Sequence, residues 1–149
     1  MSLEITINAE IKTAMLAKNE AALRALRAIK SAILLAKTAD GKQGEINEED
    51  EIKLLQKLAK QRKDSLEVFE KQQREDLAIK EREELEIIEK YLPKQMDESE
   101  LKSVLQEIIT QVGATSAADM GKVMGVASKQ LAGKADGKAI SAMVKTILT

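Results

Sequence analysis

The sequence predicts an all-α protein, and three observations support this prediction. Ala, Leu, Lys, Glu and Gln dominate the 149 residues, and these are strong helix formers. Apolar residues recur at spacings of three and four, the period of a buried helix face. The single proline, Pro93, separates longer helical patterns from shorter ones that are rich in glycine. We therefore expect an amino-terminal domain of four long helices over residues 1–93 and a smaller three-helix domain over residues 94–149.

The amino-terminal domain contains two helix-start signals. Asn19 and Asn47 are expected N-caps of the second and third helices, since Asn side chains accept from free N–H groups there. The third helix is expected to run to about Gln73, a glycine-containing loop to precede it at residues 38–44, and Pro93 to end the fourth. The expected inward faces are Ile7, Ile11, Ala14 and Met15; Ala22, Leu26, Ile29, Ile33 and Ala36; Ile52, Leu55, Ala59, Leu66 and Phe69; and Leu77, Leu85, Ile88 and Leu92.

The carboxy-terminal domain has stronger boundary signals. Asp97 and Glu100 form an expected capping box, and Gly113 suits the left-handed residue that ends a helix. Ser116 is expected to cap the next helix and Asp136 the last one, with Gly133 as the terminator between them. The expected inward faces are Leu101, Val104, Leu105 and Ile108; Met120, Val123, Met124, Ala127 and Leu131; and Ile140, Met143, Val144 and Ile147.

Composition excludes several function classes. Cys and His are absent, which removes disulfides, thiolate nucleophiles and the commonest metal ligand. Aromatic residues are 1% of the chain, too few for a surface that stacks single-stranded bases. No apolar run approaches the ~20 residues of a membrane span. The start of the chain lacks a basic segment followed by an apolar one, so we expect no signal peptide and a cytoplasmic location.

The first glycine cluster is Met120–Gly125, in which Gly121 and Gly125 share one helix face. Each glycine inside a helix costs about 1 kcal/mol relative to Ala, so a compensating role is expected. Two interpretations stand at this point. The glycines permit tight helix packing within the domain, or they form an exposed notch that a partner approaches closely. Lys122 and Lys129 exclude a membrane dimer of the kind that this spacing otherwise suggests.

The second cluster, Gly133–Lys138, resembles a phosphate-binding loop only superficially. Its glycine spacing is one residue short, Ala139 stands where Ser or Thr is required, and no strand precedes it. A helix amino terminus beginning near Asp136 still offers N–H groups to an anion, with Lys134 and Lys138 beside it. A capped turn with solvated lysines is the alternative. Residues 117–149 carry five Lys against two Asp, a local charge of +3 in a chain of net charge −1.

Other charged clusters favour structural roles. The run Glu81–Glu86 could hold a metal or paired catalytic carboxylates, but a solvated helix face with i,i+4 ion pairs is the better interpretation. The basic residues of the second and third helices could meet phosphates, but a solvated face is again the better interpretation; they are Arg24, Arg27 and Lys30, and Lys57, Lys60, Arg62 and Lys63. We expect no catalytic residue, no metal site and no cofactor.

Four segments together resemble the GatB/YqeY family, in its stand-alone YqeY form. They are Leu26–Ala32, Glu86–Pro93, Met120–Gly125 and Gly133–Lys138, and the resemblance covers essentially the whole chain. It implies an all-α protein whose smaller domain is similar to the tail of GatB, a subunit of the tRNA-dependent amidotransferase. In GatB that tail contacts tRNA, while the chemistry lies in a separate domain. The family label also implies a carbon–nitrogen ligase activity with glutamine as amido-N-donor, for which this chain shows no machinery.

The resemblance leads to a hypothesis of a non-catalytic, tRNA-associated helical module. Its nucleic-acid-binding residues would be Gly121, Lys122, Gly125, Lys134, Gly137 and Lys138. Two alternatives stay open: an adaptor that docks on a synthetase or amidotransferase, and an accessory subunit of glutamine-dependent amide transfer. The expected partner is accordingly tRNA or a tRNA-processing enzyme, with no membrane and no small-molecule site.

Overall fold

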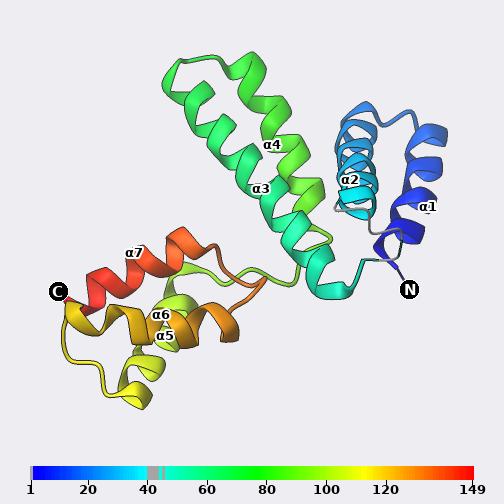
Figure 1. Cartoon of the computed structure of the whole chain (residues 1–149). Helices are drawn as coiled ribbons and strands as arrows, with labels where there is room; N and C mark the ends of the chain where they lie inside the picture. The colour runs from blue at the N-terminus through cyan, green and yellow to red at the C-terminus, as the bar shows by residue number, and fades with distance from the viewer. Residues whose placement is uncertain (1, 40–43, 45) are drawn as a thin grey trace. The chain divides into compact units, whose positions relative to one another are not determined.

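The computed structural model describes residues 2–39, 44 and 46–149, and over these residues the protein is built from helices alone (Figure 1). The α-helices are α1 (Leu3–Leu16), α2 (Glu20–Thr38), α3 (Glu48–Lys71), α4 (Glu75–Glu89), α5 (Glu98–Val112), α6 (Met120–Gln130) and α7 (Gly137–Leu148). A short 3-10 turn, η2 (Ala117–Asp119), leads into α6. The all-α prediction is confirmed. Most of the loop expected at residues 38–44 lies outside the described residues, and Thr38 is the last residue of α2.

The chain divides into two compact units, Met1–Leu92 and Pro93–Thr149. In the first unit α1 pairs with α2 and α3 with α4, while α2 also packs on α4 (Figure 1). Its core is formed by residues from all four helices, chiefly Ile7, Leu26, Ile29, Ile33, Leu55 and Ile88. In the second unit α5, α6 and α7 contact one another around a separate core of Leu105, Ile108, Val123, Ala127, Leu131 and Val144.

The expected helix starts are largely confirmed. The side chains of Asn19 and Asn47 accept from the N–H groups of Ala22 and Asp50, and Asp97 and Glu100 form the capping box. Ser116 and Asp136 occupy N-cap positions without a side-chain cap bond, so that part of the prediction is wrong. At η2 the Asp119 carboxylate accepts from the Thr115 N–H at 3.0 Å instead. This bond lowers the pKa of Asp119, and the charge of Lys122 lowers it further.

Some helix ends have a left-handed residue that the sequence predicts, and others have one that it does not. Gly113 is left-handed, at φ +70°, as expected for the end of α5. Lys18 and Gln73 also adopt positive φ, although neither is a glycine. Near Pro93 the chain leaves α4 earlier than expected, at Glu89, through a tightened turn in which Leu92 N–H donates to the Glu89 carbonyl. Proline, which lacks an N–H group, follows directly after this turn.

The expected inward faces hold for most positions but not all. Ile29, Ile33, Ile88 and Val144 are fully buried, whereas Met15 is 55% exposed. Leu3 is buried in the core instead of Met15. It precedes Ile7 by about one helical turn and therefore lies on the same face of α1. None of the helices that the structure describes combines the length and apolar character that crossing a bilayer requires.

Candidate nucleic-acid interface

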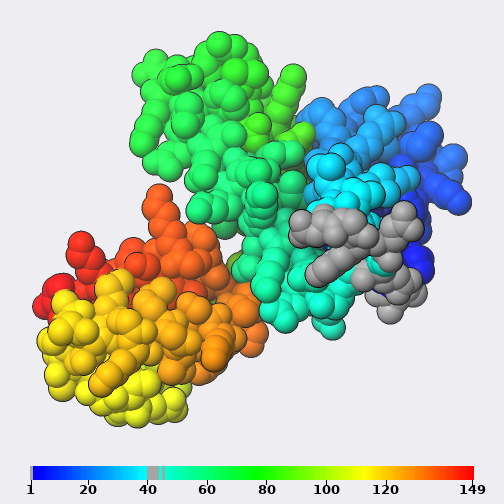
Figure 2. Space-filling view, in the orientation of Figure 1, coloured from blue at the N-terminus to red at the C-terminus, as the bar shows by residue number. Residues whose placement is uncertain are grey.

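The exposed face of α6 carries a shallow groove of about 650 Å³. Figure 2 shows this helix as the yellow-to-orange surface of the second unit. Val123 and Ala127 turn into the core, so residues on the other side of the helix are left in solvent. The groove is lined by Gly121, Lys122, Gly125, Val126, Lys129 and Gln130.

Both glycines of α6 are open to the outside. A methyl group placed on Gly121 or Gly125 would meet no atom of the described chain within 4 Å, apart from the two adjacent residues and the neighbouring helix backbone. The packing interpretation of this cluster therefore has no support within the unit. The helix bears the cost of two glycines without any internal close approach that would require them. The glycines leave open space beside the α6 backbone at these two positions.

Lys122 and Lys129 border this groove seven residues apart, which places them on the same side of α6 about 10 Å apart along its axis. Lys129 and Val126 were not among the residues predicted for the site. The seven-residue spacing, two full helical turns, was the signal that could have identified Lys129. Both lysines are exposed, and neither lies within ion-pair distance of a described carboxylate.

The second glycine cluster forms the connection between α6 and α7. Gly133 is buried at φ +79°, a left-handed conformation that glycine adopts without strain. Lys134, Gly137 and Lys138 are exposed, with Gly137 as the first residue of α7. The structure thus brings Gly121, Lys122 and Gly125 together in the groove, while Lys134, Gly137 and Lys138 lie outside its lining.

The connection is fastened by Gln95, a residue that the sequence did not single out. The Gln95 side-chain amide donates to the carbonyl oxygens of Pro93 at 2.8 Å and Gly133 at 2.7 Å. Next to it, the Met96 N–H donates to the Lys134 carbonyl at 2.9 Å. The start of the second unit is therefore bonded to the segment that leads into α7.

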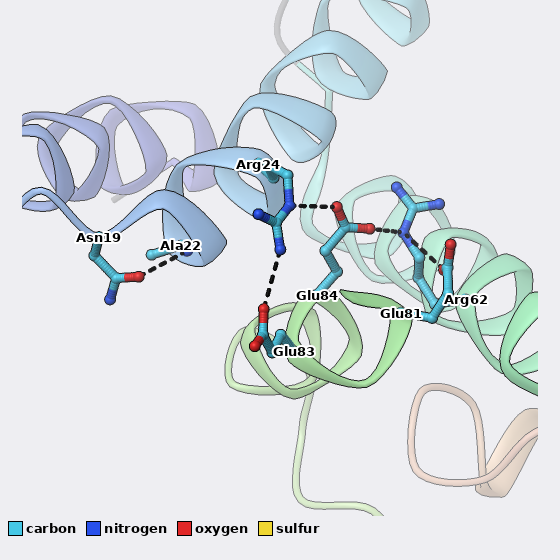
Figure 3. A network of polar contacts seen from close by, with 7 residues as sticks. All are labelled: Asn19, Ala22, Arg24, Arg62, Glu81, Glu83 and Glu84. Atoms are coloured by element: carbon cyan, nitrogen blue, oxygen red, sulfur yellow. Dashed lines mark hydrogen bonds and ion pairs between the residues drawn. The ribbon is translucent and has the colours of Figure 1, made fainter. Parts of the chain in front are cut away.

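The Glu-rich segment of α4 has a different role from the expected solvated face. Glu84 lies between Arg62 of α3, at 2.7 Å, and Arg24 of α2, at 3.5 Å (Figure 3). Glu83 pairs with Arg24 at 3.0 Å, and Glu81 lies 3.8 Å from Arg62. These ion pairs join three helices rather than successive turns of one helix. The expectation of i,i+4 pairs is wrong here because the interhelical partners are closer.

Partial burial and ion pairs between helices give this cluster a structural role. Only 15% of the Glu84 side chain and 21% of the Arg62 side chain are exposed. Desolvation raises the pKa of Glu81, Arg62 lowers it in part, and neighbouring Glu84 raises it again. Over the described residues, no group of three or more carboxylates is arranged to hold a metal ion. The arginines already supply the positive charge that these carboxylates require.

These features define a class: an all-helical protein of two compact units, one fastened by interhelical ion pairs and one presenting uncovered lysines. Comparison with known proteins makes this more specific. The chain belongs to the YqeY-like protein family, whose pattern matches residues 4–148. The sequence-based identification of the family is therefore confirmed.

Two curated relatives carry the same printed name, altered inheritance of mitochondria protein 41, mitochondrial. The relative from Clavispora lusitaniae is 37% identical over 115 residues, which cover 75% of this chain and 65% of the relative, just under two thirds. A relative from Saccharomyces cerevisiae is 32% identical over 152 residues, covering 94% of this chain and 74% of the relative.

These names contradict the cytoplasmic location expected from the sequence, because the relatives are named as mitochondrial proteins. The expectation rested on the lack of a basic start followed by an apolar segment. That criterion detects secretory signals, whereas mitochondrial targeting segments are amphipathic and rich in Arg and Ser. The criterion therefore could not decide between cytosol and mitochondrion.

Proposed function

We propose that this protein is a non-catalytic module that contacts structured RNA, with tRNA as the leading candidate, through its second unit. The observation that carries the proposal is that the exposed lysines of the second unit lie outside ion pairs. Within the described part of the chain, ion pairs with a nitrogen–oxygen distance of 4 Å or less occur only in the first unit. The exposed lysines of the second unit lie outside such pairs and so remain available to phosphates.

The groove on α6 suits a polyanionic backbone better than a small substrate. Lys122 and Lys129 supply positive charge at its border, and Gly121 and Gly125 leave the helix backbone uncovered. Structured RNA is recognised largely by shape and by 2′-hydroxyl and phosphate contacts, which need close approach rather than aromatic stacking. The lining offers amines, an amide and backbone, but no carboxylate or hydroxyl that could serve as acid, base or nucleophile. This composition supports a contact surface.

Lys134 and Lys138 extend the proposed contact surface beyond the groove. They flank the start of α7, where N–H groups of the first turn are unpaired within the helix. Because Asp136 makes no side-chain cap bond, its carboxylate does not occupy these N–H groups. Both lysines would add phosphate contacts.

The test is a salt titration of the full-length protein with total tRNA, followed by fluorescence anisotropy. Each phosphate contact by a lysine contributes about 0.7–0.9 to the slope of log K against log salt, so we expect a slope of about −2 to −4. Absence of binding at about 50 mM salt, where such contacts are strong, would contradict the proposal.

A second outcome would favour a protein partner over RNA. If tRNA does not bind and a purified synthetase or amidotransferase binds with an affinity that ignores both salt and nuclease, the adaptor hypothesis is favoured. Matched measurements with and without nuclease separate the two, since RNA-bridged association disappears when the RNA is digested.

A further inference from the structure

Gln95 stands out because it joins two segments of the second unit that are distant in sequence. Its side-chain amide has two N–H donors, and both are used, one on the Pro93 carbonyl and one on the Gly133 carbonyl. The Met96 N–H bonds the Lys134 carbonyl, and the Met96 side chain packs against the core of the unit. Two hydrogen bonds, from Gln95 to Gly133 and from Met96 to Lys134, therefore hold residues 93–96 against residues 133–134, and the bond from Gln95 to Pro93 fixes the Gln95 side chain within its own segment.

These bonds take the place of the N-cap at Asp136 that the sequence predicts for α7. A side-chain cap from Asp136 would normally fix the start of α7, and it is missing. The turn after α6 is closed by bonds from the Lys134 and Ala135 N–H groups to the Leu131 carbonyl. The carbonyls of Gly133 and Lys134 instead face the incoming chain, where Gln95 and Met96 satisfy them.

We infer that Gln95 is a positioning residue: it fixes the α6–α7 connection and thereby holds Lys134 and Lys138 in place for an RNA phosphate backbone. This inference rests on the proposed function for its ligand, but its structural part stands apart from it. Lys134 follows Gly133 directly. Lys138 lies in the first turn of α7, and the connection sets the direction in which α7 begins. Lys122, on α6, is not attached to Gln95 by any of these bonds and should be unaffected.

The substitution that tests this is Gln95→Met, which keeps an unbranched side chain of similar length but removes both donors. Gln95→Glu is a second variant that replaces a donor by a carboxylate facing two carbonyl oxygens. Gln106→Met, on the exposed surface of α5, is the matched control because the Gln106 side chain makes no hydrogen bond in the described chain. Circular dichroism of each variant confirms that the helices are retained.

The first readout is amide hydrogen exchange, which needs no RNA. We expect faster exchange at residues 133–138 in Gln95→Met and Gln95→Glu, and unchanged exchange at the α6 residues and in Gln106→Met. Equal exchange at residues 133–138 in all four proteins would overturn the inference whatever the RNA result.

The second readout is a double-mutant cycle on tRNA affinity at fixed salt. Gln95→Met should weaken binding about 3- to 10-fold, and it should do so equally in a Lys122→Gln background, because independent sites are additive. In a Lys134→Gln, Lys138→Gln background the further loss should vanish. An undiminished loss in that background would show that Gln95 acts through general stability and would refute the positioning role.

The two readouts separate the failure of this inference from that of the proposed function. If wild-type protein does not bind tRNA at low salt, the proposed function fails and the RNA-positioning role of Gln95 fails with it. If wild-type protein binds tRNA and Gln95→Met binds equally well, the proposed function stands and the positioning role is wrong.

Discussion

Each of the two units has a net charge close to zero, but the two units arrange their charges differently. The first unit carries 17 basic and 19 acidic residues, and the second carries seven and six. In the first, Arg24, Arg62 and Lys63 pair with carboxylates across helix boundaries. In the second, Lys122, Lys129, Lys134 and Lys138 are exposed and outside ion pairs. Net charge therefore says little about function here, whereas the placement of each charge says more.

This difference also separates the roles of the two units. Ion pairs that join helices fix one packing arrangement in a domain whose long helices are highly charged. Exposed lysines outside ion pairs remain available to an external anion. The glycines follow the same division, because Gly121 and Gly125 stand in open solvent rather than between helices. Substitutions of the paired charges in the first unit are accordingly expected to alter stability, and substitutions of the exposed lysines in the second are expected to alter binding.

The largest stability effect is expected at Glu84, the carboxylate shared by two arginines. Glu84→Gln removes the charge that Arg24 and Arg62 both use while keeping the side-chain shape, and we expect a loss of about 2 kcal/mol because the site is largely buried. Urea unfolding followed by the fluorescence of Tyr91, which belongs to the first unit, measures it.

Glu83→Gln serves as the matched control for this prediction. Glu83 pairs with the same Arg24, but 43% of its side chain is exposed, so solvent screens the pair and the loss should be much smaller. Equal losses in the two variants would mean that burial does not set the strength of these ion pairs.

The next effect in size has the opposite sign and lies in the second unit. Gly121→Ala and Gly125→Ala should each stabilise the protein by about 0.5–1 kcal/mol, since Ala favours the helix and its methyl group meets nothing. Hydrogen exchange of the α6 amides measures the gain. The same variants should bind tRNA more weakly, because the added methyl groups obstruct close approach to the backbone.

Gly113→Ala provides the contrast for the glycine prediction. Gly113 also has open space around it, but its φ of +70° is unfavourable for Ala, so this substitution should destabilise the protein by about 1 kcal/mol. If Gly121→Ala and Gly125→Ala also destabilised the protein, the interpretation of α6 as an uncovered helix would be wrong.

The smallest effect concerns the pH dependence of the first unit. The pKa of Glu81 is raised above its ordinary value of 4.5, chiefly by desolvation. The folded state therefore holds this proton more tightly, and the associated stability is present below pH 4.5 and lost as pH rises through the raised pKa. Glu81→Gln should be slightly more stable than wild type at neutral pH, with a difference that shrinks on acidification. Urea midpoints at several pH values test it, and a constant difference would contradict it.

Much of the fold could be predicted because its signals are local. The caps at Asn19, Asn47 and Asp97 each depend on a side chain reaching an N–H group three residues ahead, which the sequence states directly. Periodicity likewise located the core residues Ile29, Leu105 and Val144.

What the sequence could not reveal depends on residues far apart along the chain. Glu84 finds its partners on two other helices, and Gln95 finds Gly133 38 residues away. The positive φ of Lys18 and Gln73 could not be predicted either, because in a sequence only glycine or asparagine indicates such a conformation. For the candidate interface, the sequence led us to predict the glycines and three lysines but could not tell whether Gly121 and Gly125 faced a neighbouring helix or solvent.

The central claim is that the unpaired lysines of the second unit, and not positive charge in general, contact RNA. The direct test compares two triple variants with the same change in net charge: Lys122→Gln, Lys134→Gln, Lys138→Gln in the second unit, and Lys12→Gln, Lys57→Gln, Lys60→Gln among exposed lysines of the first. We predict that the second-unit variant reduces the magnitude of the salt slope for tRNA binding by about 2–3, while the first-unit variant keeps the wild-type slope. Equal reductions in the two variants would contradict the account.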